Sequence, residues 1–88
     1  MTKPLPKILE EEDKKWRELG FQLVYVGKFP KNPDVDVYRT NDISGRVRET
    51  GFPTAYIVSD TDYVERHGFD AFDLINETME FAKKQKSL

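Results

Sequence analysis

Asp60, Thr61 and Asp62 directly follow an apolar segment, and carboxylates at the end of a strand can bind a hard cation. A calcium loop needs further oxygen ligands and a glycine, but Val64 occupies the third ligand position and Glu65 the glycine position. Asp and Thr also cap helices by accepting backbone N–H groups. We therefore expect these residues to cap a helical turn, and we predict no metal site and no cofactor.

His67 is the only histidine, so acid–base or nucleophilic chemistry would have to combine it with Ser44 or Ser59. Neither serine lies in a nucleophile-elbow sequence. The chain has no cysteine, which excludes thiolate catalysis, disulfides and Cys-based metal sites. We interpret His67 as a helix-end residue beside Gly68, and we predict that the protein is not an enzyme.

A central basic cluster comprises Arg39, Arg46 and Arg48, which neither a helix end nor a nearby acidic residue on the same helix face accounts for. Guanidinium groups bind carboxylates and phosphates through paired hydrogen bonds, and the neighbouring Tyr38 adds an aromatic ring. The glycines around the cluster match no phosphate-binding loop. We predict that Arg39, Arg46, Arg48 and Tyr38 contact a partner, and that the partner is another protein.

Nucleic acid is the alternative partner for the same cluster. The chain has 14 basic and 16 acidic side chains, a formal net charge of −2, whereas non-specific nucleic-acid binding relies on a strong positive field. Acidic residues that would repel phosphate also alternate with the basic ones, namely Asp34, Asp36, Asp42 and Glu49. Protein binding is therefore the favoured function and nucleic-acid binding the weaker one.

Membrane binding has little support in the sequence. Lys83, Lys84 and Lys86 form the only terminal basic group, and three lysines suit the C-terminal end of a helix, where cations are favoured. No apolar run approaches the roughly 20 residues of a membrane span, and we find no signal peptide. Together with the absence of cysteine, this leads us to expect a cytoplasmic protein without a membrane partner.

Two amphipathic helices are expected, one near each end of the 88-residue chain. The first carries apolar residues at three-, four- and seven-residue spacings, and Gly20 suits its C-terminal cap: Leu5, Ile8, Leu9, Trp16 and Leu19. The second begins at Phe69-Asp70 after Gly68, and its predicted core-facing stripe is Ala71, Phe72, Leu74, Ile75, Met79 and Ala82. Trp16 is expected to be buried against a sheet between the two helices.

Three strands are expected between the helices. Phe21–Phe29 is rich in β-branched and aromatic residues, which predicts a central strand buried on both faces. Asp34–Thr40 alternates polar and apolar residues, which predicts a strand with one wet face, and we expect Val35–Arg39 to form an edge. Thr54–Ser59 is the third strand. Residues 41–52 fit either a short helix or an extended connection, and this choice stays open.

These patterns predict one α+β domain over residues 1–88, in the order α-β-β-β-α, with a single sheet packed by two terminal helices. We expect a non-enzymatic protein-binding or regulatory module that acts through an exposed sheet face or an edge strand. A homodimer through an edge strand is one form of this function. No motif identifies the partner.

Overall fold

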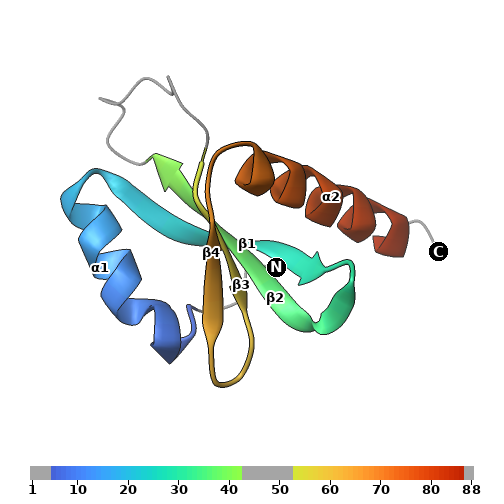
Figure 1. Ribbon diagram of the computed structural model, residues 1–88, viewed down its shortest axis with the longest axis horizontal. Helices are drawn as coiled ribbons and strands as arrows, with labels where there is room; N and C mark the ends of the chain where they lie inside the picture. The colour runs from blue at the N-terminus through green and yellow to red at the C-terminus, as the bar shows by residue number, and fades with distance from the viewer. Residues whose placement is uncertain (1–4, 43–52, 87–88) are drawn as a thin grey trace.

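The computed structural model describes residues 5–42 and 53–86, which form a four-stranded antiparallel sheet and two helices. The strands follow one another in space as in sequence: β1 Phe21–Phe29, β2 Asn32–Asp42, β3 Ala55–Val58 and β4 Tyr63–Arg66. A 3₁₀ turn, η1 Lys7–Leu9, leads into α1 Glu10–Glu18, and α2 Gly68–Lys86 follows β4. The predicted α+β class is confirmed, with four strands instead of three (Figure 1).

The additional strand, β4, lies where the sequence predicted a single helical turn. Ser59 and Asp62 close a tight hairpin in which the Ser59 N–H donates to the Asp62 carbonyl over 2.8 Å. β4 then pairs antiparallel with β3, and the Tyr63 ring lies 5.6 Å from the Tyr56 ring, centroid to centroid. The predicted turn was wrong because cross-strand packing outweighs the capping tendency of the polar residues before it.

β2 is an interior strand, paired with β1 on one side and with β3 on the other. The predictions of Val35–Arg39 as an edge and of Phe21–Phe29 as a central strand were therefore wrong, since the sheet edges are β1 and β4. Alternation of polar and apolar residues indicates which face of a strand meets solvent, but it does not indicate whether the strand lies at an edge of the sheet. A homodimer through an edge strand would have to use β1 or β4.

The two helices cover opposite faces of the sheet (Figure 1). The face under η1 and α1 has an aromatic-rich core, whose buried members are Leu9, Leu23, Tyr38, Tyr56 and Val58. The face under α2 has a core of smaller side chains, namely Val37, Ala55, Ala71, Leu74 and Ile75. Two separate small cores therefore stabilise the fold, and each depends on one helix.

The N-terminal helical segment follows the sequence prediction closely. Leu9 is fully buried, and Trp16 is half-buried against the same core. Gly20 has φ 92°, the left-handed conformation expected of a C-terminal cap. Leu19 lies beyond the end of α1 and is 64% exposed, so it does not belong to the core-facing stripe in which it was placed.

α2 packs with a narrower stripe than the sequence predicted. Ala71, Leu74 and Ile75 are buried as expected, and Thr78 is fully buried with its hydroxyl donating to the Leu74 carbonyl over 2.7 Å. The larger side chains predicted for this stripe, Phe72 and Met79, are 46% and 45% exposed. The difference follows from close packing, because small residues let the helix approach the sheet and leave bulky ones outside.

Residues 41–52 are described only in part. Asn41 and Asp42 are the last two residues of β2, so the start of this segment is extended. Residues 43–52, which include Arg46 and Arg48, lie outside the described residues. Neither described helix combines the length and the apolar character that crossing a membrane requires.

Candidate protein-binding groove

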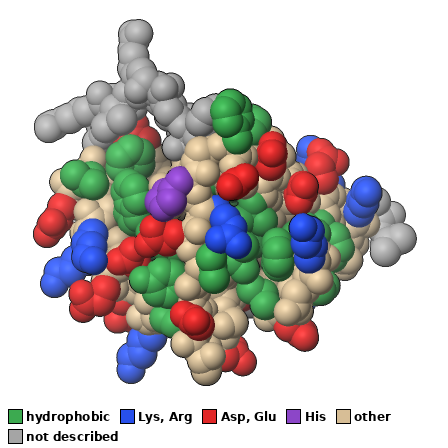
Figure 2. Space-filling view, viewed as in Figure 1, with side chains coloured by type: hydrophobic (Ala, Val, Ile, Leu, Met, Phe, Trp, Pro, Cys, Tyr) green, Lys and Arg blue, Asp and Glu red, His purple; other side chains and the backbone are tan. Residues whose placement is uncertain are grey.

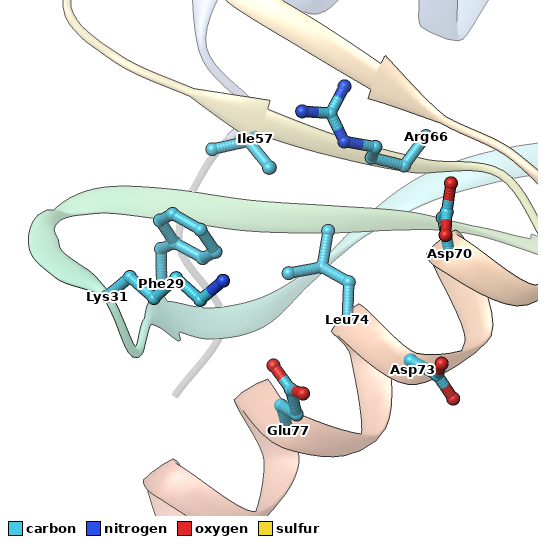
Figure 3. Close-up of a pocket in the computed structure, with 8 residues that line it drawn as sticks. All are labelled: Phe29, Lys31, Ile57, Arg66, Asp70, Asp73, Leu74 and Glu77. Carbon is cyan, nitrogen blue, oxygen red and sulfur yellow. The ribbon is translucent and has the colours of Figure 1, made fainter.

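A groove of about 370 Å³ lies on the α2 side of the sheet. Figure 3 shows α2 forming one wall, with β3, β4 and the end of the β1–β2 hairpin forming the other. Phe29, Ile57 and Leu74 point into the space between the walls. Charged residues surround this apolar floor: Lys31, Arg66, Asp70, Asp73 and Glu77. The groove therefore combines an apolar floor with a charged rim.

The floor is open because α2 packs mainly against β1 and covers β3 only in part. Side chains alternate along β3, so Ala55 and Ile57 face α2 while Tyr56 and Val58 face the other core. Ala55 is fully buried, but Ile57 is only partly buried. Val64 lies directly opposite Ile57 on β4 and is 44% exposed. The apolar strip therefore extends from the groove to the edge of the sheet.

The two walls of the groove carry opposite charges. Asp70, Asp73 and Glu77 belong to α2 and recur at three- and seven-residue intervals, which places them on one helix face. Lys31 and Arg66 lie across the groove from them (Figure 3). None of these five side chains forms an ion pair with another residue that the structure describes. Charges of both signs are therefore available to a bound molecule.

The surface view agrees with this arrangement. Acidic and basic side chains surround apolar ones on the α2 side of the face shown in Figure 2. Phe69, at the start of α2, is 70% exposed. Single exposed apolar residues are normal on a protein surface, so the distinguishing feature here is the continuous strip of Ile57 and Val64 beside a concave site.

The β4 edge is partly closed by its own side chains. The Tyr63 N–H donates to Asp62 Oδ1 over 2.8 Å, and the Glu65 carbonyl accepts from Arg66 Nη1 over 3.2 Å. These bonds occupy backbone groups that an added strand would need, and charged residues on an edge discourage pairing. The edge is therefore a poorer binding surface than the groove beside it.

The β1 edge is closed by the helix that packs on it. Asp13 is 7% exposed, and its Oδ1 accepts the Leu23 N–H over 2.9 Å. Its Oδ2 accepts from Arg17 Nε over 2.7 Å. The carboxylate thus satisfies a backbone donor of the edge strand and is itself held by a guanidinium group.

A second polar cluster joins α1 to β3 on the opposite face. Trp16 Nε1 donates to the Tyr56 hydroxyl over 2.8 Å, and that hydroxyl donates to Glu12 Oε1 over 3.2 Å. Tyr56 is 1% exposed, and burial raises the pKa of its hydroxyl well above the ordinary value. The hydrogen bond from Trp16 opposes this rise, while the charges of Glu65 and Glu12 add to it. Burial therefore favours the neutral form of Tyr56, and the hydrogen bonds of the cluster join α1 to β3.

The polar cluster continues across β4. Burial raises the pKa of Glu12, but hydrogen bonds with Glu65, Lys15 and Tyr56 outweigh burial, so the net pKa of Glu12 is lowered. His67 Nε2 lies 3.0 Å from Glu65 Oε2. Its Nδ1 lies 3.2 Å from the hydroxyl of the residue before β3, Thr54. Since these groups bond one another, we interpret the cluster as structural.

The structure describes two of the four residues predicted to contact a partner, Tyr38 and Arg39, and they face opposite sides of the sheet. Tyr38 is 2% exposed in the core under α1, while Arg39 faces the other side of the sheet and donates to the Thr40 carbonyl over 3.1 Å. Arg46 and Arg48 lie outside the described residues, so the proposed role of the cluster stays a prediction. The buried position of Tyr38 leaves its ring no surface to offer a partner.

The other candidates for chemistry take structural positions. Asp62 caps the first N–H of β4, and His67 lies between β4 and α2. The described part of the chain contains no group of three or more His, Cys, Asp or Glu side chains that could hold a metal ion.

The sequence did not reveal the groove. Asp70 was expected only at the start of the second helix, and Phe29 and Ile57 were expected as parts of strands. The available signal was the set of three acidic residues spread over two helical turns, Asp70, Asp73 and Glu77. Because this set continues beyond the first turn, helix capping alone does not account for it.

Comparison of the chain with protein-family models, with curated proteins and with solved structures gives no significant match.

Proposed function

We propose that this protein is a non-enzymatic protein-binding module and that its partner binds in the groove between α2 and the strands β3 and β4. The observation that carries the proposal is the partly exposed apolar strip of Ile57 and Val64 beside a groove whose charged side chains form no ion pair within the described part of the chain. Protein-binding surfaces combine an apolar centre, which loses water on binding, with a polar rim that sets orientation.

The edges of the sheet are less suited to binding a partner than the groove is. Local hydrogen bonds occupy backbone groups of both β4 and β1, so strand addition would first have to break them. The groove needs no such rearrangement. Of the two surfaces expected from the sequence, an exposed sheet face or an edge strand, the sheet face is the better supported.

The composition supports a cytoplasmic site of action. A chain without cysteine gains nothing from an oxidising compartment, because it can form no disulfide. We place the protein and its partner in the cytoplasm on this ground.

The proposal is tested by affinity capture with a matched pair of variants. Val64→Lys places a charge on the apolar strip, while Leu19→Lys makes the same change at an exposed apolar residue beyond α1. We expect wild type and Leu19→Lys to retain one partner protein, and Val64→Lys to bind the purified partner about tenfold more weakly, since an apolar contact loses roughly 1–2 kcal/mol.

Circular dichroism should show that both variants fold, since both sites are exposed. Equal binding of the purified partner by wild type, Val64→Lys and Leu19→Lys would move the interface away from the groove. Retention of a partner that Leu19→Lys alone loses would place the interface near the end of α1.

A further inference from the structure

The charges of the groove suggest what kind of segment it binds. Its acidic wall carries three carboxylates, whereas its basic wall carries Lys31 and Arg66. One Arg66 nitrogen already donates to the Glu65 carbonyl on its own strand. Three carboxylates against two basic groups give the groove a formal net charge of −1, and a ligand with positive charge complements it.

The apolar floor sets the second requirement. Phe29, Ile57 and Leu74 come from three separate elements and point into one space of about 370 Å³. This volume is at the lower end of the range for ligand pockets, about 300–1,000 Å³, and it suits one or two large apolar side chains of a peptide.

The spacing along α2 sets the third requirement. Asp70 and Glu77 are seven residues apart, which corresponds to about 10 Å along a helix axis. An extended peptide advances about 3.3 Å per residue, so basic side chains two to four residues apart, being long and flexible, can reach both carboxylates. Asp73 lies between the two in sequence and borders the same groove (Figure 3).

We propose that the groove binds a peptide segment in which a large apolar side chain is flanked by lysine or arginine within four residues. This inference rests on the proposed function and specifies the partner's chemistry. The apolar side chain fills the floor between Leu74 and Ile57, and the basic side chains lie along α2. An acidic protein segment and a nucleic acid are the alternatives that the experiment distinguishes.

The test is a selection from a random peptide library displayed on phage, carried out in parallel on wild type and on two single variants. Glu77→Lys reverses a charge inside the groove, and Glu18→Lys makes the same change at an exposed position at the end of α1, away from the groove. Wild type and Glu18→Lys should both enrich peptides with a large apolar residue flanked by Lys or Arg. Glu77→Lys should bind the enriched peptides about tenfold more weakly.

The experiment separates failure of the basic-segment inference from failure of the groove as the binding site. Enrichment of acidic peptides that Lys31→Glu abolishes would overturn the basic-segment inference and keep the groove as the binding site. Enrichment of no peptide, or of peptides that bind wild type and both Lys variants equally, would count against the groove itself. Tight binding of a random single-stranded oligonucleotide at physiological salt, lost in Lys31→Glu, would replace the peptide with nucleic acid.

Glu77→Gln keeps the side-chain length and removes only the charge. It should weaken binding of the selected peptides less than Glu77→Lys does. A Gln variant that binds as tightly as wild type would mean that the size or shape of the new lysine, rather than the loss of the negative charge, weakens binding in Glu77→Lys, and would overturn the inference.

Discussion

Gly27 allows α2 to lie close to β1. A Cβ atom built at this position would lie 3.1 Å from Thr78 Cγ2, closer than carbon atoms normally pack. The Thr78 side chain is held in place by its hydrogen bond to the Leu74 carbonyl. The glycine is therefore needed for close packing, although its φ is not positive.

Gly27→Ala should therefore destabilise the fold by about 1–2 kcal/mol, as overpacking of a filled core usually does. Chemical denaturation of wild type and variant measures this difference. In a Thr78→Ser background, which lacks the Cγ2 methyl, the cost of Gly27→Ala should be smaller, because the remaining contacts of the new Cβ are at 3.6 Å or more. An equal cost in both backgrounds would contradict the assigned contact.

Tyr56 makes stability depend on pH at alkaline values. Its pKa is raised in the folded protein chiefly by burial, so the folded state disfavours the ionised form. A raised pKa contributes stability that is complete below the unfolded value, near 10, and is lost as the pH rises above it.

Wild type should lose stability between about pH 10 and pH 12, and Tyr56→Phe should lose less over the same range. Denaturant titrations at a series of pH values measure both slopes. At neutral pH Tyr56→Phe should still cost about 1–2 kcal/mol, because Trp16 loses an acceptor and Glu12 loses a donor. Identical slopes in the two proteins would show that another group governs the alkaline transition.

At the scale of elements, one buried carboxylate joins α1 to the sheet. Asp13 accepts the Leu23 N–H and the Arg17 guanidinium, and it lies on the helix while Leu23 lies on the edge strand. Removing the carboxylate would leave the Leu23 N–H buried without a partner, which costs more than the lost bond itself.

Asp13→Ala should accordingly destabilise the protein by about 1–3 kcal/mol, while Asp13→Asn, which keeps an acceptor oxygen, should cost less. Amide hydrogen exchange measures the loss of this hydrogen bond directly, since the Leu23 amide should lose protection in Asp13→Ala before the amides of β3 and β4 do. Uniform loss of protection across the sheet would mean that α1 and the sheet unfold as one unit.

Some elements could be predicted from the sequence because their signals are local. The capping glycine Gly20 and the stripe of Ala71, Leu74 and Ile75 predicted the helices correctly. The fourth strand could not be predicted, because Tyr63–Arg66 is four residues long and acquires its structure by pairing with β3. Strand order also depends on non-local pairing, which explains why β2 was expected at an edge.

The groove depends on a relation that no single segment contains. α2 packs mainly against the edge strand β1 rather than over the centre of the sheet, and this lateral position leaves Ile57 partly exposed and Val64 exposed. Composition shows that these residues are apolar but not which helix covers them. Glu77 and Lys31 lie far apart in the sequence, and only the folded chain brings them to one groove.

At the scale of the whole molecule, we propose that one surface is responsible for binding. Side chains of Asp62, Arg66 and Asp13 form hydrogen bonds with backbone groups of the two edge strands, which partly blocks strand addition. The opposite face of the sheet is covered by η1 and α1, which pack on the aromatic-rich core. On the α2 side, apolar surface, charged side chains and a concave shape occur together. A partner that binds elsewhere would require a different explanation of that coincidence.

The most direct measurement is site-specific photocrosslinking in living cells. A benzophenone amino acid replaces Val64 in one sample and Leu19 in the other, since both are exposed apolar residues and lie on different parts of the molecule. The account predicts one discrete crosslinked protein from position 64 and none from position 19. Crosslinking from position 19 alone, or with equal yield from both positions, would contradict the groove as the binding surface.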